Sequence, residues 1–194
     1  MASFAKKRGQ MNEYSDDELL KLFRDEHSRD RAFGKIVNQY RERLYWHIRK
    51  LLIVHEDTDD VLQNTFVKAW KGLDGFRGDA QLSTWLYRIA TNESVTFLKQ
   101  KRHMQMVPLE DVEYQLSGSL HHDTYFSGDE LQLRLQKAIL SLPEKQRIVF
   151  NMKYFDEMPY EEMSEVLGTS VGALKASYHL AVKKIKAWFE MNDS

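Results

Sequence analysis

The sequence predicts an all-α protein with two small helical domains joined by an acidic flexible linker. The second domain is predicted to contain a helix-turn-helix. Apolar residues recur at spacings of three and four through most of the 194 residues, and no stretch shows the period of two that marks a strand. The 9 glycines and 3 prolines are few, and several stand where helices would begin or end. Residues 104–128 have no sustained apolar face and are too long for a loop inside a compact domain, so they are predicted to be the linker.

The first predicted domain covers residues 15–103 and follows an N-terminal extension, residues 1–14. We expect its first helix to begin at Ser15, because Ser15 and Glu18 have the spacing of a capping box. Amphipathic patterns predict three further helices, over residues 31–52, from about 57 to 70 or 72, and from 83 or 84 to about 101. A glycine-punctuated loop, residues 72–79, precedes the last of them.

The second predicted domain covers residues 129–194 and begins with an amphipathic helix. Pro143 and Pro159 each stand where a further helix would begin, a position that tolerates a residue without an N–H. Gly168 ends the short helix that Pro159 opens, since glycine readily adopts a positive φ. Ser170 then caps a last helix that we expect to run from residue 171 to about 189.

The composition excludes several classes of protein. The chain has no cysteine, which excludes a disulfide scaffold, a thiol nucleophile and a cysteine-ligated zinc site. The seven histidines are scattered, so we predict no enzyme activity, no metal, no cofactor and no small-molecule substrate. No apolar run approaches the roughly 20 residues that span a bilayer, and the N-terminus lacks the core of a signal peptide. We therefore expect a soluble, cytoplasmic protein.

The net charge of -1 is an average over segments of different sign. Residues 31–103 sum to +5, whereas residues 104–128 contain four acidic residues and no lysine or arginine. A polyanion responds to local charge within a Debye length of roughly 8–10 Å, and not to the average over the chain. The near-zero net charge therefore does not exclude a nucleic-acid partner.

Residues 160–174 have the spacing of a helix-turn-helix, with a short helix, a three-residue turn and a capped second helix. Small and basic residues fall on the outer face of the second helix, which has no carboxylate between Val171 and Ala187. Such a helix can enter the major groove of DNA, with small residues allowing close approach and lysines reaching phosphates. The same pattern also fits a helical hairpin with a solvated lysine face, because interaction modules share this geometry.

Residues 76–92 interleave aromatic, basic and amide side chains around a flexible loop. Aromatic rings among cations suit unpaired bases, because any base can stack on a ring. The alternative is that Phe76 and Trp85 are ordinary core residues. Upstream, four acidic residues within residues 56–60 stand at a helix start, where capping or partner contact is more common than metal binding.

Taken together, these motifs resemble those of bacterial sigma factors of the extracytoplasmic-function group. Residues 57–70 are similar to the helix that binds core RNA polymerase in that family, and residues 76–92 to the segment that melts promoters. Residues 142–147 and the turn at residues 170–172 are similar to the second domain of the same group. The likeness extends over roughly residues 15–188 in the same order, with an acidic linker between the domains.

The resemblance implies three binding surfaces. The first would bind the clamp helices of core RNA polymerase and would consist of Asp57, Asp59, Asp60, Gln63, Asn64 and Trp70. The second, for the −10 element and its flipped non-template base, would consist of Phe76, Arg77, Asp79, Ala80, Thr84, Trp85, Arg88, Asn92, Lys99, Lys101 and Arg102. The third, for the −35 duplex, would consist of Ser170, Gly172, Ala173, Lys175, Ala176, Ser177, His179 and Lys183.

The last helix departs from the commoner family pattern at three positions. Ser177, Leu180 and Val182 stand where arginines are frequent in the family, so the bases that this helix contacts stay open. Leu180 is predicted to make an apolar contact, such as one to a thymine methyl group. Fewer cations also predict weak DNA binding by the free protein, with the polymerase supplying the rest through avidity.

The resemblance implies a non-enzymatic factor that directs core RNA polymerase to promoter DNA. It also implies an anti-sigma partner, which in this group is often membrane-anchored and would then hold the factor at the inner face of the membrane. The alternative is a stand-alone helix-turn-helix regulator with an N-terminal sensing domain. That regulator would bind duplex DNA tightly without polymerase and would have a ligand pocket within residues 15–103.

Overall fold

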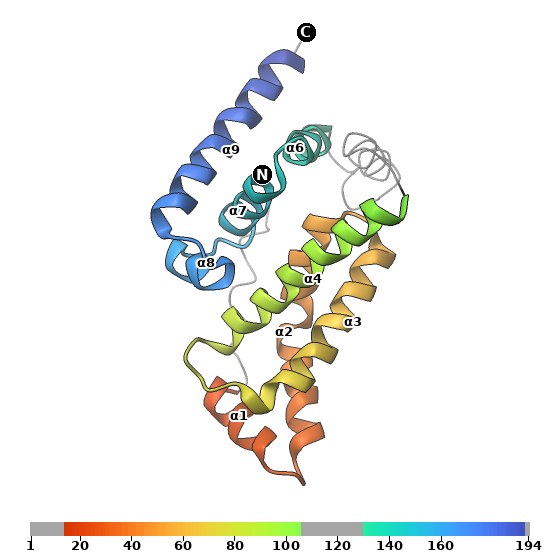
Figure 1. Ribbon diagram of the computed structural model, residues 1–194, viewed down its shortest axis with the longest axis vertical. Coiled ribbons are helices and arrows are strands. Elements are labelled where there is room, and N and C mark those ends of the chain that lie inside the picture. Colours follow the sequence, from red (N-terminus) through yellow and green to blue (C-terminus); the bar gives the residue numbers. More distant parts are fainter. Residues whose placement is uncertain (1–13, 106–129, 193–194) are drawn as a thin grey trace.

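The computed structural model describes residues 14–105 and 130–192, and within these ranges it contains eight α-helices and no strand (Figure 1). The predicted all-α fold with two helical regions is therefore confirmed. The N-terminal extension and the acidic linker lie outside the described residues, apart from their edges. Helix α4 extends to Gln105 and so includes two residues that the sequence assigns to the linker.

The first region contains α1 (Asp16–Arg24), α2 (Arg29–Leu52), α3 (His55–Gly72) and α4 (Leu82–Gln105), with a 3-10 turn at Leu73–Gly75. The capping box is present, since the backbone N–H of Ser15 donates to Glu18 Oε2 at 2.8 Å and that of Glu18 to Ser15 Oγ at 3.3 Å. The hydrogen bonds that the backbone N–H and the hydroxyl of Ser15 donate to the exposed Glu18 carboxyl lower its pKa. Apolar side chains from all four helices form one core, including Leu19, Ile36 and Leu86, which are fully buried.

Helix α4 begins at Leu82, earlier than predicted, because another helix caps it. Asp16, in the first turn of α1, accepts the backbone N–H of Leu82 at 2.9 Å through one carboxylate oxygen. Through the other it accepts the hydroxyl of Tyr40 on α2 at 2.8 Å. Burial raises the pKa of the Tyr40 phenol, and the neighbouring Asp16 carboxylate raises it further. Asp16 thus connects three helices, α1, α2 and α4, at the point where the loop at residues 76–81 ends and α4 begins.

The second region contains α6 (Glu130–Leu140), α7 (Glu144–Tyr154), α8 (Tyr160–Leu167) and α9 (Val171–Asn192). Pro143 and Pro159 are the residues that precede α7 and α8. Gly168 ends α8 with a φ of 61°, and Ser170 Oγ accepts the backbone N–H of Ala173 at 3.4 Å. The predicted helix-turn-helix is therefore present as α8, a three-residue turn and α9.

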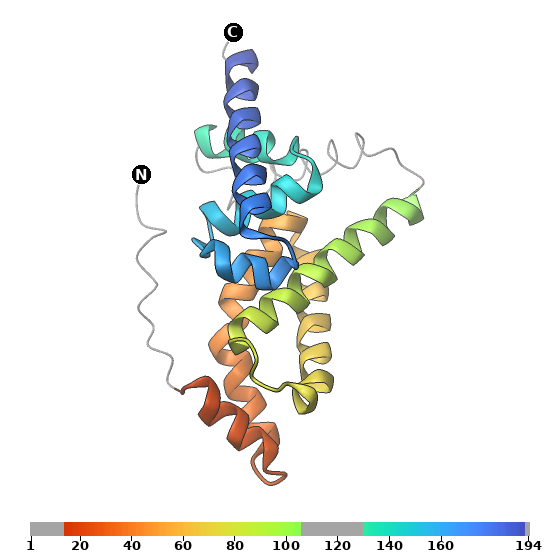
Figure 2. The same cartoon turned by 60° about the vertical axis from the view of Figure 1, so that its left-hand side comes forward.

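The two regions pack directly on each other, which the sequence does not predict. In Figures 1 and 2, α8 lies along the first half of α4, and α7 lies beside α2. Leu51 of α2, 1% exposed, belongs to a buried cluster with Ile148, Met152 and Met163 of the second region. Tyr87 and Val95 of α4 pack against the same cluster.

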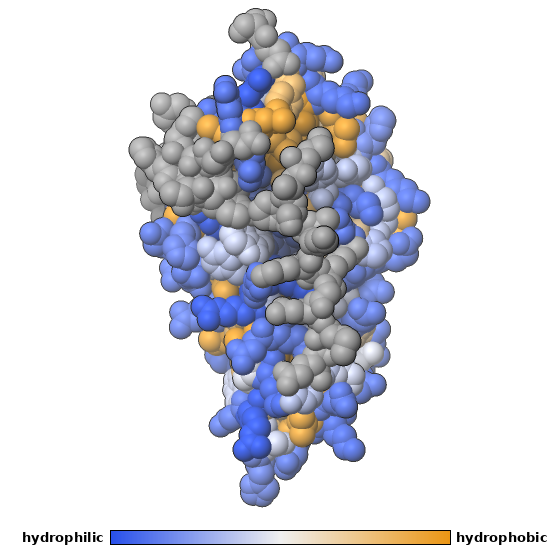
Figure 3. All heavy atoms as spheres, turned by 180° about the vertical axis from the view of Figure 1, so that it is seen from behind, coloured by the Kyte–Doolittle hydropathy of each residue, from blue (hydrophilic) through white to orange (hydrophobic). Residues whose placement is uncertain are grey.

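Figure 3, which shows the molecule from behind, has hydrophobic side chains near its upper end, where α6 and α9 lie. Leu131 and Met191, which are 61% and 74% exposed, belong to these two helices. Among the described residues, no helix has both the length and the apolar character needed to cross a membrane.

Candidate nucleic-acid interface

The polymerase-binding candidates form an exposed, acidic face of α3. Asp59, Asp60, Gln63 and Asn64 are exposed and follow one another along the helix at spacings of one to three residues. Asp57 is less exposed, because its carboxylate accepts a hydrogen bond from Lys101 Nζ at 2.5 Å. This ion pair joins a polymerase-binding candidate on α3 to a −10 candidate on α4.

Trp70, the last candidate on α3, is half-buried and has a packing role. Its ring makes edge-to-face contacts with Phe23 at 5.3 Å and Phe33 at 5.0 Å between centroids. The Arg29 guanidinium lies 5.1 Å from the same ring. Trp70 therefore supports the domain and also forms part of its surface.

An apolar groove of about 530 Å³ lies between α2 and α3, beside the acidic face. It is lined by Asp59, Gln63 and Trp70 from the predicted set, and also by Arg41 and Val67, which the sequence analysis did not select. The apolar side chain of Val67 is 45% exposed and therefore does not belong to the buried core. The signal for Val67 in the sequence is its position on the polar side of an amphipathic helix, four residues after Gln63.

The loop before α4 separates into core residues and exposed residues. Phe76 is 8% exposed, and its ring packs on Trp85 with the centroids 5.1 Å apart, which agrees with the alternative that it belongs to the core. Arg77 and Asp79 have side chains that are 86% and 83% exposed and lie 3.6 Å apart. Gly78 between them has a φ of 82°, a conformation that favours glycine. Arg77 and Asp79 are thus the accessible part of this loop.

Five residues of α4 form a stripe, which we call the α4 stripe: Thr84, Arg88, Asn92, Val95 and Lys99. Their spacings of three and four place them on one helix face. Arg88, Asn92 and Lys99 are exposed, whereas Thr84 is 1% exposed. The stripe contains four of the −10 candidates, and all of its residues except Asn92 lie beside the second region. Of the remaining candidates, Lys101 is engaged with Asp57, and Arg102 lies on α4 with its side chain outside the described residues.

The −35 candidates lie on the outer face of α9 and the turn before it. All are exposed except Ser177, which is half-buried, while Leu174, Ala181 and Ile185 point into the core. The Lys175 ammonium lies 5.7 Å from the centre of the Tyr160 ring. Partial burial raises the pKa of the phenols of Tyr160, at the start of α8, and of Tyr178, on α9 itself. The face therefore has small residues near its start and lysines further along.

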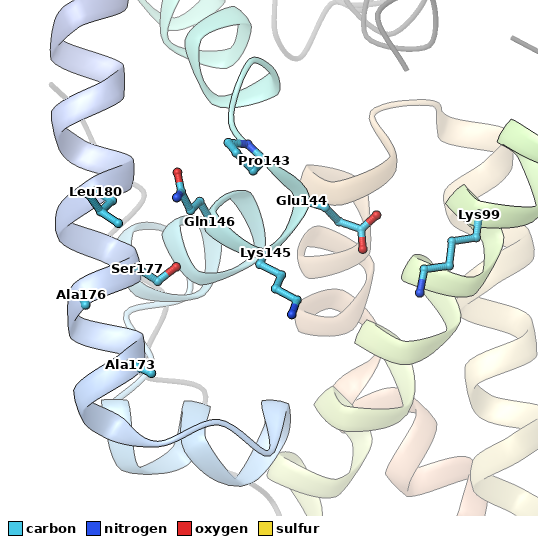
Figure 4. Close-up of a pocket in the computed structure, with 9 residues that line it drawn as sticks. All are labelled: Lys99, Pro143, Glu144, Lys145, Gln146, Ala173, Ala176, Ser177 and Leu180. Carbon is cyan, nitrogen blue, oxygen red and sulfur yellow. The ribbon is translucent and has the colours of Figure 1, made fainter. Parts of the chain in front are cut away.

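A second groove, of about 1030 Å³, lies between this face and the first region. Ala173, Ala176, Ser177 and Leu180 line it from α9, and Lys99 lines it from α4 (Figure 4). Pro143, Glu144, Lys145 and Gln146 form its floor at the start of α7. In Figure 4 the side chains of Lys99 and Lys145 point toward each other from opposite domains.

Sequence reasoning missed the polar contacts that hold the two regions together. Asp156, between α7 and α8, accepts hydrogen bonds from His47 and Lys50, which lie one turn apart on α2. No motif marks these residues, and His47 and Asp156 are 109 positions apart in the sequence. Their only sequence signal is a histidine on the apolar face of a long helix.

Comparisons with known proteins match both regions of the chain. The profile of sigma-70 region 2 matches residues 36–104, and that of sigma-70 region 4 matches residues 132–185. The chain is 32% identical over 157 residues to the ECF RNA polymerase sigma factor SigW of Bacillus subtilis, covering 76% of this chain and 83% of that protein. It is 29% identical over 174 residues to the ECF RNA polymerase sigma-E factor of Escherichia coli, covering 86% of this chain and 90% of that protein.

Two solved structures share the fold. CnrH in complex with the cytosolic domain of CnrY has a TM-score of 0.66 and 25% identity, and the match covers 91% of this chain and 97% of that one. The sigma factor RpoE of Bartonella quintana, in complex with the anti-sigma factor NepR, has a TM-score of 0.64 and 22% identity, over 81% and 96% of the two chains. The helices, the order of the two regions and the sequence likeness agree, and the chain belongs to the family of ECF RNA polymerase sigma factors.

Proposed function

We propose that this sigma factor, which directs RNA polymerase to promoters as a non-enzymatic specificity subunit, recognises the −35 element as duplex through α9 and the −10 element as a melted strand through α4. The observation that carries the proposal is the outer face of α9. Small exposed residues, Gly172, Ala173 and Ala176, stand beside Lys175 and Lys183, with no carboxylate between Val171 and Ala187. A face of this kind can approach base edges closely while lysines neutralise phosphates.

The −10 assignment is supported by the exposed part of the loop and by the α4 stripe. Arg77 and Asp79 flank Gly78 in a loop that presents both charges to solvent. Arg88, Asn92 and Lys99 continue along α4 with spacings that follow one helix face. Extracting a base from the stack requires about a few kcal/mol, so a site that holds the extracted base can select sequence while it opens the duplex.

Polymerase docking is assigned to the acidic face of α3 and to the groove beside it. Asp59 and Gln63 line this groove together with the exposed Val67, and Asp60 is exposed next to Asp59. Apolar surface with a charged rim is the usual composition of a protein interface. This surface suits a basic partner helix, and we assign the clamp helices of core RNA polymerase to it.

An anti-sigma protein is a further proposed partner. The two solved relatives are complexes, one with the cytosolic domain of CnrY and one with the anti-sigma factor NepR. The groove between α4, α7 and α9 is lined by residues of both DNA-binding surfaces, so a protein that filled it would block both. Membrane anchoring of such a partner remains part of this proposal.

The decisive experiment is transcription by core RNA polymerase with this chain on a genomic library, with the start sites mapped. We expect starts that share one −35 and one −10 element and that are absent without the chain. In the same assay Lys175→Glu should remove dependence on the −35 element and leave binding to core polymerase unchanged. A library without chain-dependent starts would contradict the proposed function, and unchanged promoter use by Lys175→Glu would contradict the assignment of α9.

A further inference from the structure

The second region covers part of the surface that we assign to the −10 strand. Thr84 Oγ1 donates to Glu162 Oε1 of α8 at 3.4 Å, and Arg88 Nη2 donates to the carbonyl oxygen of Glu165 at 2.6 Å. Val95 packs against the buried cluster of α7, α8 and α9, and Lys99 lines the groove beside α9. Four of the five residues of the α4 stripe therefore face the second region.

A buried ionic cluster holds this arrangement, and we call it the interdomain latch: His47, Lys50 and Asp156. Asp156 Oδ2 lies 2.7 Å from His47 Nδ1, and Asp156 Oδ1 accepts from Lys50 Nζ at 2.8 Å. The side chains of His47, Lys50 and Asp156 are 0%, 12% and 6% exposed. Both carboxylate oxygens of a second-region residue thus bind the same helix of the first region.

Each ring nitrogen of His47 has one hydrogen-bond partner, Asp156 at Nδ1 and Thr91 at Nε2. Thr91 Oγ1 donates to the carbonyl oxygen of Tyr87 at 2.7 Å, so at 3.0 Å it accepts from His47 Nε2. An ionised Asp156 carboxylate can only accept, so it accepts a hydrogen bond from His47 Nδ1. His47 and Lys50 of α2 thus both contact the one carboxylate of Asp156.

Apolar packing keeps water from the latch. Leu51 follows Lys50 in α2 and is buried among side chains of α7 and α8. Asn151 Nδ2 on α7 also donates to the carbonyl oxygen of Lys50 at 3.2 Å, at the end of α2. A charge pair in such surroundings is screened little by salt, and removal of one partner leaves the other charge buried.

We propose that the free chain is self-inhibited, with the interdomain latch holding α8 over the α4 stripe until the two domains separate. This inference rests on the proposed function in one respect, because that function identifies the covered surface as the −10 site. The acidic face of α3 stays exposed in the closed form, so polymerase can engage it first. Opening then frees Thr84 and Arg88 for the melted strand, and the closed population reduces the apparent affinity for the promoter complex.

The closed state can be measured by fluorescence energy transfer within the full chain. The chain has no cysteine, so Lys99→Cys and Lys145→Cys place two dyes across the groove without other changes. We expect one high-transfer population for the otherwise unchanged chain. Asp156→Ala, and independently Lys50→Glu from the other side of the latch, should shift the closed-to-open ratio by at least about tenfold toward low transfer.

Glu26→Gln is the control, because it removes an exposed carboxylate far from the latch and should leave the transfer high. Circular dichroism shows whether each variant keeps its helices, and Lys50→Glu decides the question if Asp156→Ala does not fold. An open distribution in the unchanged chain would overturn the closed state. High transfer in both latch variants would overturn the assignment of the latch.

The inhibitory role is tested by a gain of activity, which damage to the fold does not produce. In transcription with core polymerase on a mapped promoter, Asp156→Ala without dyes should reach half-maximal activity at a several-fold lower concentration than the unchanged chain. An unchanged or higher concentration would overturn self-inhibition. If neither chain supports transcription, the proposed function fails, while the fluorescence result still decides the latch.

Discussion

Asp156 retains its charge at a buried position because two cations surround it. Burial raises the pKa of this carboxyl, but the charges of His47 and Lys50 and their hydrogen bonds outweigh burial, so its pKa is lowered. A carboxyl whose pKa is lowered in the closed state stabilises that state at pH values above its ordinary pKa of about 3.9. The stabilisation is lost as the pH falls through the lowered pKa.

The first prediction is therefore an acid-induced opening of the free chain. Energy transfer between dyes at positions 99 and 145 should stay constant from pH 7 to about pH 5 and fall below about pH 4, as Asp156 gains a proton. Asp156→Asn cannot titrate at this position, so its transfer should be low at neutral pH and lack this transition. A fall that both chains share would assign the transition to general unfolding instead.

Single residues differ in how far the sequence predicts them. Arg77, Lys175 and Lys183 are exposed as expected, because their motifs fix the local helix and loop. Thr84 shares its helix face with Arg88 but is buried beneath α8, and Phe76 is buried in the core. His47 and Asp156 could not be predicted, since their meeting depends on how the two domains pack.

At the scale of the helix, the sequence predicts the end of a helix correctly where the residue that caps it lies nearby in the sequence. The start of α1 and the end of α8 follow from Ser15 and Gly168, whose capping contacts lie within a few residues. Helix α4 begins before the predicted residue because its N-terminal cap is Asp16, 66 positions away. Helix α3 begins at His55 after Val54, which provides no side-chain cap and so leaves no signal.

The second prediction concerns the turn of the helix-turn-helix. Gly168 has a φ of 61° and open space around its Cα, so Gly168→Ala should destabilise only through backbone strain, by about 1 kcal/mol. Gly34, inside α2, also has open space but no positive φ. Gly34→Ala should therefore stabilise the chain by about 0.5–1 kcal/mol, since alanine favours helix. Thermal denaturation followed by circular dichroism measures both, and equal signs would contradict this account of the turn.

At the scale of the whole molecule, the charges are divided between surfaces with different partners. The acidic face of α3 and the basic end of α9 lie in different regions, although the net charge is only -1. The all-α fold, the helix-turn-helix and the family could be predicted from the sequence, because each depends on local patterns. The packing of the two regions could not, because its contacts join residues about 80 to 110 positions apart, with no repeated pattern between them.

The third prediction distinguishes a sigma factor from a stand-alone regulator. The free chain should bind duplex DNA weakly, in the range of roughly 10⁻⁴–10⁻⁶ M at physiological salt, and more weakly as salt rises from about 50 to 200 mM. Core polymerase should strengthen binding to a mapped promoter by joining several contacts in one complex. Fluorescence anisotropy with and without polymerase measures this. Tight binding of one duplex by the free chain would instead favour the regulator.

The position of Asp156 between α7 and α8 has a consequence for engineered promoter specificity. A chimera that takes its second domain from another sigma factor acquires a new −35 preference and also loses the partner of His47 and Lys50. By the proposed self-inhibition, such a chimera would reach half-maximal transcription at a lower concentration than a chain that keeps the latch. Grafting only the outer face of α9 would change the −35 preference and keep the latch, so the concentration dependence should stay that of the unchanged chain.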